Sequence, residues 1–192
     1  MLSAEREKKF NDTAKNRDLG LVVVVEDIHD PHNAAAILRS CDAFGVQRVC
    51  FIFGKEERYN PKKIGKATSS SANKWLDFEI FDSAKTCFEK LRSEGFSIFA
   101  TILDENAGAI KKINFKKKKV AIVVGNEHRG ISEEAARLAD EKVYIPMQGM
   151  VQSLNVSVSA GICLFEARRQ RGARFSASKK EAAFLLEDFR NR

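Results

Sequence analysis

The sequence predicts an α/β fold in which a mostly parallel β-sheet is sandwiched by helices. Continuous apolar runs at residues 21–25, 49–53 and 120–124 are rich in Val, Ile or Phe and are typical of strands buried on both faces. Between the runs lie stretches whose apolar residues are spaced three and four apart, as in amphipathic helices. This alternation of strands and helices favours parallel pairing. A chain of 192 residues is also about the length of one domain.

Each element is predicted from the apolar pattern and from the residues that begin or end helices. Asp30 and Pro31 begin a helix that ends at Gly45. Gly95 ends another helix, and Ser132 caps a short one. The expected strands are residues 21–25, 49–53, 75–81, 96–103, 120–124 and 142–145. The expected helices are a short polar helix within the first nineteen residues, then 31–45, a weak helix at 62–69, 83–94, 132–139, 153–171 and 179–189.

This pattern predicts three parts in the chain. An N-terminal helical extension covers residues 1–19, the α/β domain covers 20–171, and a basic C-terminal helical extension covers 172–192. Residues 168–178 are interpreted as a linker before the last helix.

Composition excludes several classes of protein. With 44% hydrophobic and 31% charged residues, the chain has the composition of a globular protein rather than a disordered one. It has four cysteines and no CxxC pair, which argues against a disulfide framework or a structural zinc site and favours the reducing cytoplasm. No apolar run approaches the roughly 18 residues of a membrane span, and the first residues lack the apolar centre of a secretory signal. We therefore expect a cytoplasmic protein without a membrane or metal partner.

The net charge of +7 indicates a polyanionic partner. Basic residues gather in three regions, at 55–74, 111–119 and 166–192, and the apolar segments between them carry few charges. The alternative is that these regions are only solvated surfaces kept soluble by lysine. On charge alone, a nucleic-acid partner is modestly favoured over the solvated-surface interpretation.

Polar segments follow three of the predicted strands, at residues 26–33, 125–130 and 145–155. In open α/β sheets, ligands bind beyond the carboxyl ends of the strands, so these segments are candidate sites. Each also has a simpler interpretation. His29 and His32 lack a third nearby metal ligand, Gly125 and Gly130 are compatible with ordinary turns, and Ser153 and Asn155 are compatible with helix caps. The chain has no GxGxxG or GKS/GKT phosphate loop, and no GxSxG elbow surrounds Ser153.

Together the three segments resemble the three sequence motifs of one family. Asn33-Ala-Ala-Ala-Ile-Leu-Arg39, then Gly125-Asn-Glu127-His-Arg-Gly130, then Ile145-Pro-Met-Gln-Gly-Met-Val-Gln-Ser153-Leu-Asn155 are similar, in order and spacing, to motifs 1, 2 and 3 of the SpoU (TrmH) family. Its members are RNA ribose 2′-O-methyltransferases of the SPOUT superfamily. The resemblance covers nearly the whole chain and is greatest to members that methylate guanosine 18 of tRNA. The alternatives are another tRNA position such as the wobble ribose, an rRNA, or a non-catalytic RNA-binding protein with the same fold.

The resemblance implies a C-terminal trefoil knot, a homodimer, and S-adenosylmethionine bound in the knot without a metal. By position, the cofactor-binding residues are Thr101, Gly125, Ile145 and Leu154. The catalytic set implied by the motifs is Asn33, Arg39, Glu127, Ser153 and Asn155. Family accounts make the motif 1 arginine, here Arg39, the base that takes the hydroxyl proton near the cofactor of the opposite subunit. A guanidinium stays protonated in proteins, so Arg39 also suits a purely electrostatic role.

An enzyme that modifies folded RNA needs cations for the phosphate backbone. We predict that these cations come from the two terminal regions. The predicted RNA-binding residues are Arg6, Lys8, Lys9, Arg168, Arg169, Arg171 and Arg174.

Overall fold

Seven strands form one sheet in the computed structural model, which describes residues 3–64, 71–104 and 106–192. The strand order is β3-β2-β1-β6-β4-β7-β5, and every neighbouring pair is parallel. The strands are β1 (Asp18–Glu26), β2 (Val46–Ile52), β3 (Asp77–Phe81), β4 (Ser97–Thr101), β5 (Gly108–Ala109), β6 (Val120–Val124) and β7 (Glu141–Tyr144). The predicted parallel sheet is confirmed, with β5 as a short additional edge strand.

Strand β1 lies near the middle of the sheet and explains the longest apolar run of the sequence. It pairs with β2 on one side and β6 on the other, so Val23 lies between Val49 and Ile122. Both faces of the run are covered, and its residues are buried. A strand in this position selects β-branched residues that pack on both faces.

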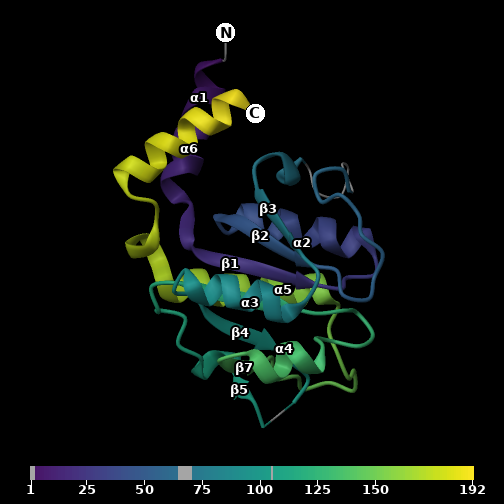
Figure 1. Cartoon of the computed structure of the whole chain (residues 1–192). Helices are drawn as coiled ribbons and strands as arrows, with labels where there is room; N and C mark the ends of the chain where they lie inside the picture. Colours follow the sequence, from purple (N-terminus) through teal and green to yellow (C-terminus); the bar gives the residue numbers. More distant parts are fainter. Residues whose placement is uncertain (1–2, 65–70, 105) are drawn as a thin grey trace.

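Helices cover both faces of the sheet (Figure 1). The helices are α1 (Ala4–Asn16), α2 (Pro31–Ala43), α3 (Ala84–Ser93), α4 (Glu133–Leu138), α5 (Val156–Arg171) and α6 (Lys179–Asn191). Short 3₁₀ turns are η1 (Ala72–Lys74), η2 (Ile110–Lys112) and η3 (Gly172–Phe175). Helices α2 and α5 share one apolar cluster with the sheet, and α3 and α4 share the other. The result is the predicted sandwich.

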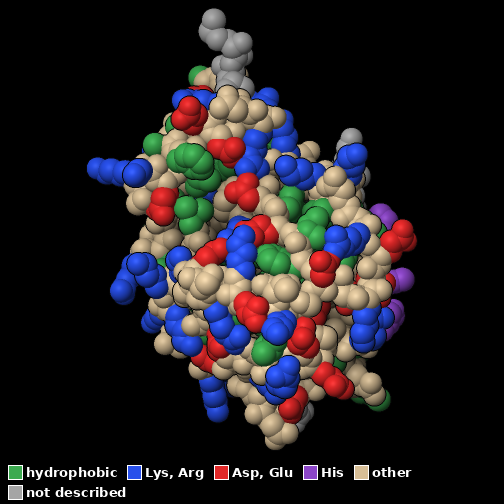
Figure 2. All heavy atoms as spheres, viewed as in Figure 1, with side chains coloured by type: hydrophobic (Ala, Val, Ile, Leu, Met, Phe, Trp, Pro, Cys, Tyr) green, Lys and Arg blue, Asp and Glu red, His purple; other side chains and the backbone are tan. Residues whose placement is uncertain are grey.

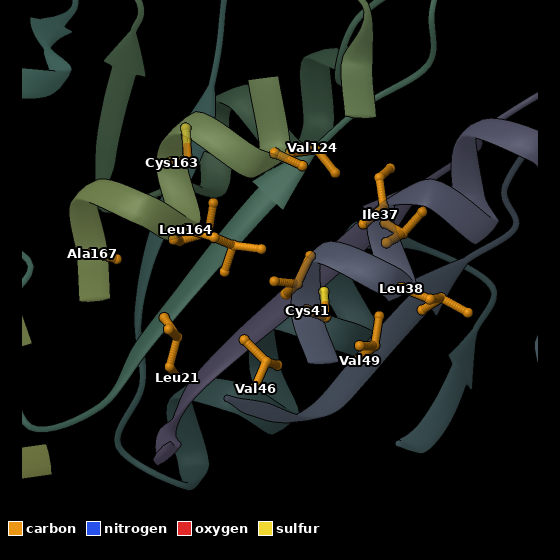
Figure 3. Packing of buried hydrophobic residues seen from close by; sticks show 14 of the residues in the cluster. Leu21, Ile37, Leu38, Cys41, Val46, Val49, Val124, Cys163, Leu164 and Ala167 are labelled. Carbon is orange, nitrogen blue, oxygen red and sulfur yellow. The ribbon is translucent and has the colours of Figure 1, made fainter. Parts of the chain in front are cut away.

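The cluster beneath α2 and α5 fixes where these two helices lie (Figure 3). Ile37, Leu38 and Cys41 point from α2 toward the sheet, and Cys163 and Leu164 approach from α5. All of them are almost completely buried, and at about 25 cal/mol per Å² of apolar area such burial is the main term that holds helices on a sheet.

Several predicted boundaries were wrong by a few residues. Helix α5 begins at Val156 instead of residue 153, because Asn155 is its N-cap and accepts a hydrogen bond from Ser157 N at 2.8 Å. Strand β3 begins at Asp77 because η1 occupies the residues just before Trp75. The weak helix predicted at 62–69 is a turn at 62–64, and its remaining residues lie outside the described part of the chain.

The two terminal helices pack against each other. Helices α1 and α6 lie side by side near the two chain ends (Figure 1). They share a small apolar cluster in which Phe10 and Phe189 contact the Trp75 ring, with centroids 5.2 and 5.9 Å away. Ser178 and Glu181 form a capping box that begins α6. The terminal extensions are therefore one packed unit.

The linker predicted at residues 168–178 is wrong over residues 168–175, because α5 continues to Arg171, as predicted for that helix, and η3 follows directly. The Arg171 guanidinium is fully buried and binds Asp18 through two hydrogen bonds of 2.6 and 2.9 Å. It also donates to the carbonyl oxygens of Phe115 and Lys117. Because its guanidinium is buried, Arg171 is not an RNA-binding residue, and this part of the prediction is wrong. Its ion pair with Asp18 instead connects α5 to the start of β1.

Replacement of Arg171 by Ala removes the two short hydrogen bonds from the buried Asp18 carboxylate and leaves it with the longer 3.4 Å contact to Arg168. We expect this change to lower the free energy of unfolding by about 3 kcal/mol, the lower end of the cost of breaking a buried ion pair. Urea unfolding measures it, and Arg169→Ala is the control. Arg169 lies two positions away on α5 and forms an exposed ion pair with the nearby Glu166, so its loss should leave the urea midpoint nearly unchanged. Equal midpoints for the two variants would contradict this role of Arg171.

Candidate active site

Loops that follow β4, β6 and β7 meet at the carboxyl edge of the sheet and enclose a cavity of about 450 Å³. The four predicted cofactor-binding residues all line it: Thr101, Gly125, Ile145 and Leu154. Cavities of roughly 300–1,000 Å³ with apolar walls and a few polar groups are typical of small-molecule sites. Here the walls combine Ile and Leu side chains with the backbone of three loops, so the residues present fit a cofactor of that size.

The loop after β6 can form only because residue 125 is glycine. A Cβ atom there would lie 2.3 Å from the backbone of Gly130 and Ile131. Asn126 and Gly130 exchange two backbone hydrogen bonds of 2.9 Å, and Gly130 has a positive φ of 67°. The interpretation of these glycines as turn residues is thus correct, and the same turn forms one wall of the cavity.

Glu127, at the tip of this turn, holds the loop after β1. Its carboxylate accepts hydrogen bonds from His29 N at 3.0 Å, Asp30 N at 3.2 Å and Asn33 Nδ2 at 2.8 Å. Burial favours the neutral acid, but the hydrogen bonds from Asn33 and the backbone outweigh it and lower the pKa of Glu127. Glu127 is therefore a carboxylate at neutral pH.

The loop after β7 joins the same network through its last residue. Asn155 Nδ2 donates to Asn33 Oδ1 at 3.0 Å, while the Asn155 side-chain oxygen caps α5. The structure therefore brings together Asn33, Glu127 and Asn155, one residue from each sequence motif. Ser153 lies two residues before the cap and lines the cavity, as does Glu127.

Arg39 lies apart from this group. It is exposed on α2, and it is not among the described residues that line the cavity. Six positions separate it from Asn33, so at about 1.5 Å of rise per residue it lies roughly 9 Å further along the helix. Within one chain, Arg39 is not positioned at the cavity.

Sequence patterns did not reveal a second network beside the first. The Asp27 carboxylate, on a residue with a φ of 50°, accepts hydrogen bonds from the backbone of Gly54, Lys55 and Glu56 in the loop after β2. Glu56 in turn contacts His29 and Arg129. The sequence held one signal for this second network. Its loops all follow strands of one predicted parallel sheet, so they lie at one edge of that sheet.

His29 and His32 were the candidate metal ligands of the sequence. Within the ranges that the structure describes, no group of three or more His, Cys, Asp or Glu side chains is arranged to hold a metal ion. All four cysteines are buried free thiols.

No helix in the described part of the chain is long and apolar enough to cross a membrane.

The remaining predicted RNA-binding residues lie at the surface of the terminal regions. Lys8, Lys9 and Arg168 line a groove of about 640 Å³ between α1 and the end of α2, together with acidic residues of α1. Arg168 is partly buried and contacts Asp18 at 3.4 Å, whereas Arg6, Arg169 and Arg174 are exposed. Cations of α1 and α5 therefore share one groove, and acidic side chains lie among them.

Comparison with known proteins agrees with this arrangement. Residues 20–165 match the SpoU rRNA Methylase family. A tRNA (guanosine(18)-2′-O)-methyltransferase from Thermus thermophilus is 39% identical over 168 residues, which are 86% of this chain and 83% of that protein. The crystal structure of the Aquifex aeolicus TrmH/SpoU tRNA modifying enzyme aligns with a TM-score of 0.83 at 33% identity, over 96% of this chain and 94% of that one. The SpoU methyltransferase AviRb from Streptomyces viridochromogenes, solved in complex with the cofactor AdoMet, aligns with a TM-score of 0.68 at 28% identity, over 83% of this chain and 61% of that one. The chain belongs to the SpoU rRNA Methylase family.

Proposed function

We propose that this protein transfers a methyl group from S-adenosylmethionine to the ribose 2′-hydroxyl of guanosine 18 in tRNA. The observation that carries the proposal is the hydrogen-bonded chain Asn155–Asn33–Glu127, which joins the three family motifs beside a cavity of about 450 Å³. The tRNA substrate is supported by the 39% identical relative, which is named for this reaction. We expect the protein to act in the cytoplasm, where tRNA is found.

The cofactor would be held mainly by backbone groups and apolar walls. Gly125 provides close backbone approach, and Ile145 and Leu154 provide apolar surface from the loop after β7. Thr101 donates its hydroxyl to Val123 O at 2.9 Å, which fixes the end of β4 at the cavity. When bound, S-adenosylmethionine supplies a sulfonium methyl group that is already activated toward attack.

The protein must then align the ribose hydroxyl and favour its alkoxide. Alignment of two reacting groups in one site supplies much of the acceleration in such transfers. Arg39 is the cation suited to stabilise the alkoxide and hold the adjoining phosphate. It lies outside the cavity of its own chain, so this role requires that a second copy bring its Arg39 to the cavity.

A homodimer would supply that arrangement. Large apolar side chains are exposed on the loop after β7 and on α5, where Met150, Val151, Val158 and Phe165 are each at least 49% exposed. Exposed apolar residues gathered on neighbouring segments mark interaction surfaces.

The trefoil knot stays a prediction of the family resemblance.

The alternatives have less support. The alignment with the tRNA modifying enzyme covers 96% of this chain, so it extends into both terminal helices. A non-catalytic RNA-binding protein would have no need for the full set of motif residues. Arg39, Glu127, Ser153 and Asn155 are all present.

Incubation with labelled S-adenosylmethionine and an unmodified tRNA transcript tests the proposal directly. We expect label at the 2′-oxygen of guanosine 18, located by nuclease mapping. A matched transcript with 2′-deoxyguanosine at position 18 lacks the acceptor and should take up no label. Label at another ribose would move the substrate assignment to that position, and no transfer to any RNA would support the non-catalytic alternative.

Mixed dimers test the shared site. Leu154→Glu should abolish cofactor binding in calorimetry because it places a charge in an apolar wall, while the control Ile80→Glu, at an exposed position on β3, should bind normally. Arg39→Ala should bind cofactor but transfer methyl groups roughly 100-fold more slowly. Heterodimers of Leu154→Glu with Arg39→Ala should recover one working site. Verified heterodimers as inactive as both parents would contradict a site built from two chains.

A further inference from the structure

The Glu56 carboxylate lies between two cationic side chains from different loops. Its Oε2 is 2.8 Å from His29 Nδ1 in the loop after β1, and its Oε1 is 2.5 Å from Arg129 Nη2 in the loop after β6. Neither contact is used by the proposed catalytic residues. The pairing brings His29 and Arg129, which would otherwise repel each other when both are charged, onto one patch of surface.

Glu56 is held firmly in this position. Its backbone N–H donates to Asp27 Oδ1 at 3.1 Å. Asn126 Nδ2 donates to the Asp27 carbonyl oxygen at 2.7 Å and lies 3.4 Å from Glu56 Oε1. The Glu56 side chain is only 17% exposed. The carboxylate is therefore a fixed counter-ion, and the two cations are ordered before any ligand arrives.

Both cations also face solvent. The His29 side chain is 67% exposed and that of Arg129 is 48% exposed. Because Nδ1 of His29 faces Glu56, Nε2 points to the other side of the ring and is a donor in the protonated form. The chain's histidines gather along one edge of the molecule, beside Lys and Arg side chains (Figure 2). Two ordered cations that are both exposed to solvent on one surface suit a phosphate oxyanion.

We propose that His29 and Arg129, held in place by Glu56, form a binding site for a backbone phosphate of the RNA substrate. The inference rests on the proposed function, because the same loops carry Glu127 and Asn33. It assigns a phosphate contact at the sheet edge, apart from the terminal regions that the basic composition indicated.

The site should respond to pH through His29. The charged groups that face it are Glu56, Glu127 and Arg129, and the hydrogen bond with Glu56 has the largest effect. Glu56 and, to a smaller extent, Glu127 raise the pKa of His29, while burial and Arg129 oppose the shift. His29 therefore keeps its positive charge to higher pH than a free histidine. As pH rises through that pKa, the group loses one positive charge and RNA binding should weaken.

Another anion could occupy the same donors. Arg129 also lines the cavity, so its guanidinium could reach the carboxylate of S-adenosylmethionine. The full-length protein separates the two possibilities, since tRNA binding and cofactor binding are measured independently. Methyl transfer by the wild type is measured first, so that failure of the proposed function is seen apart from failure of this site.

The test compares Arg129→Gln with the control Arg137→Gln. Arg137 is an exposed arginine on α4, the helix that follows the loop of Arg129. Arg129→Gln should weaken tRNA binding roughly tenfold and reduce the slope of log affinity against log salt by about 1, with cofactor affinity unchanged. Arg137→Gln should bind tRNA like the wild type. Equal tRNA affinity and salt slope in the two variants would overturn the site. Loss of cofactor affinity with intact tRNA binding would assign Arg129 to the cofactor and overturn it as well.

A pH series tests the roles of His29 and Glu56. Wild-type tRNA affinity should fall as the pH rises through the raised pKa of His29, which lies above the ordinary value for histidine, and His29→Ala should flatten this fall. Glu56→Gln should move it to lower pH because the raised pKa of His29 returns toward its ordinary value, whereas the neighbouring exposed Glu57→Gln should not move it. An unchanged pH profile in Glu56→Gln or His29→Ala would contradict the proposal.

Discussion

The candidate site depends on one carboxylate, that of Glu127. It accepts hydrogen bonds from the backbone at His29 and Asp30 and from the Asn33 side chain, and Asn33 in turn accepts one from Asn155. The acceptor lies at the N-terminus of α2, where the helix dipole favours a negative charge. One ionised group thus joins loops that are distant in sequence. Glu127 lies 94 residues from Asn33, and Asn155 lies 122 residues from Asn33.

The parallel sheet makes this convergence possible. Because every strand pair is parallel, the loops that follow β1, β6, β4 and β7 all leave the same edge. The tight turn at Gly125 then brings Glu127 back over α2 while its backbone forms a wall of the cavity. Binding of a small molecule and organisation of the motif residues therefore use the same loops, which explains why the motifs lie directly after strands.

Local patterns predicted the strands and the site region, but not contacts between distant loops. The run at Val22–Val25 indicates a buried strand from composition alone, and the polar segments after it indicate a site. In the sequence alone, Arg171 could not be told apart from the exposed arginines near it, because its partner, Asp18, lies 153 residues away. The contacts of Glu56 with His29 and Arg129 were missed for the same reason. Their residue types carry no periodic signal, and only the fold brings them together.

Amide hydrogen exchange in Glu127→Gln tests most directly whether this carboxylate holds the site together. Glutamine keeps the size but presents an N–H₂ group to donors that need an acceptor. We predict that the amides of His29 and Asp30 exchange about tenfold faster or more, while the amide of Val23 in the sheet is unchanged and a surface control, Glu133→Gln, has no effect. Unchanged exchange at His29 and Asp30 in Glu127→Gln would contradict the account.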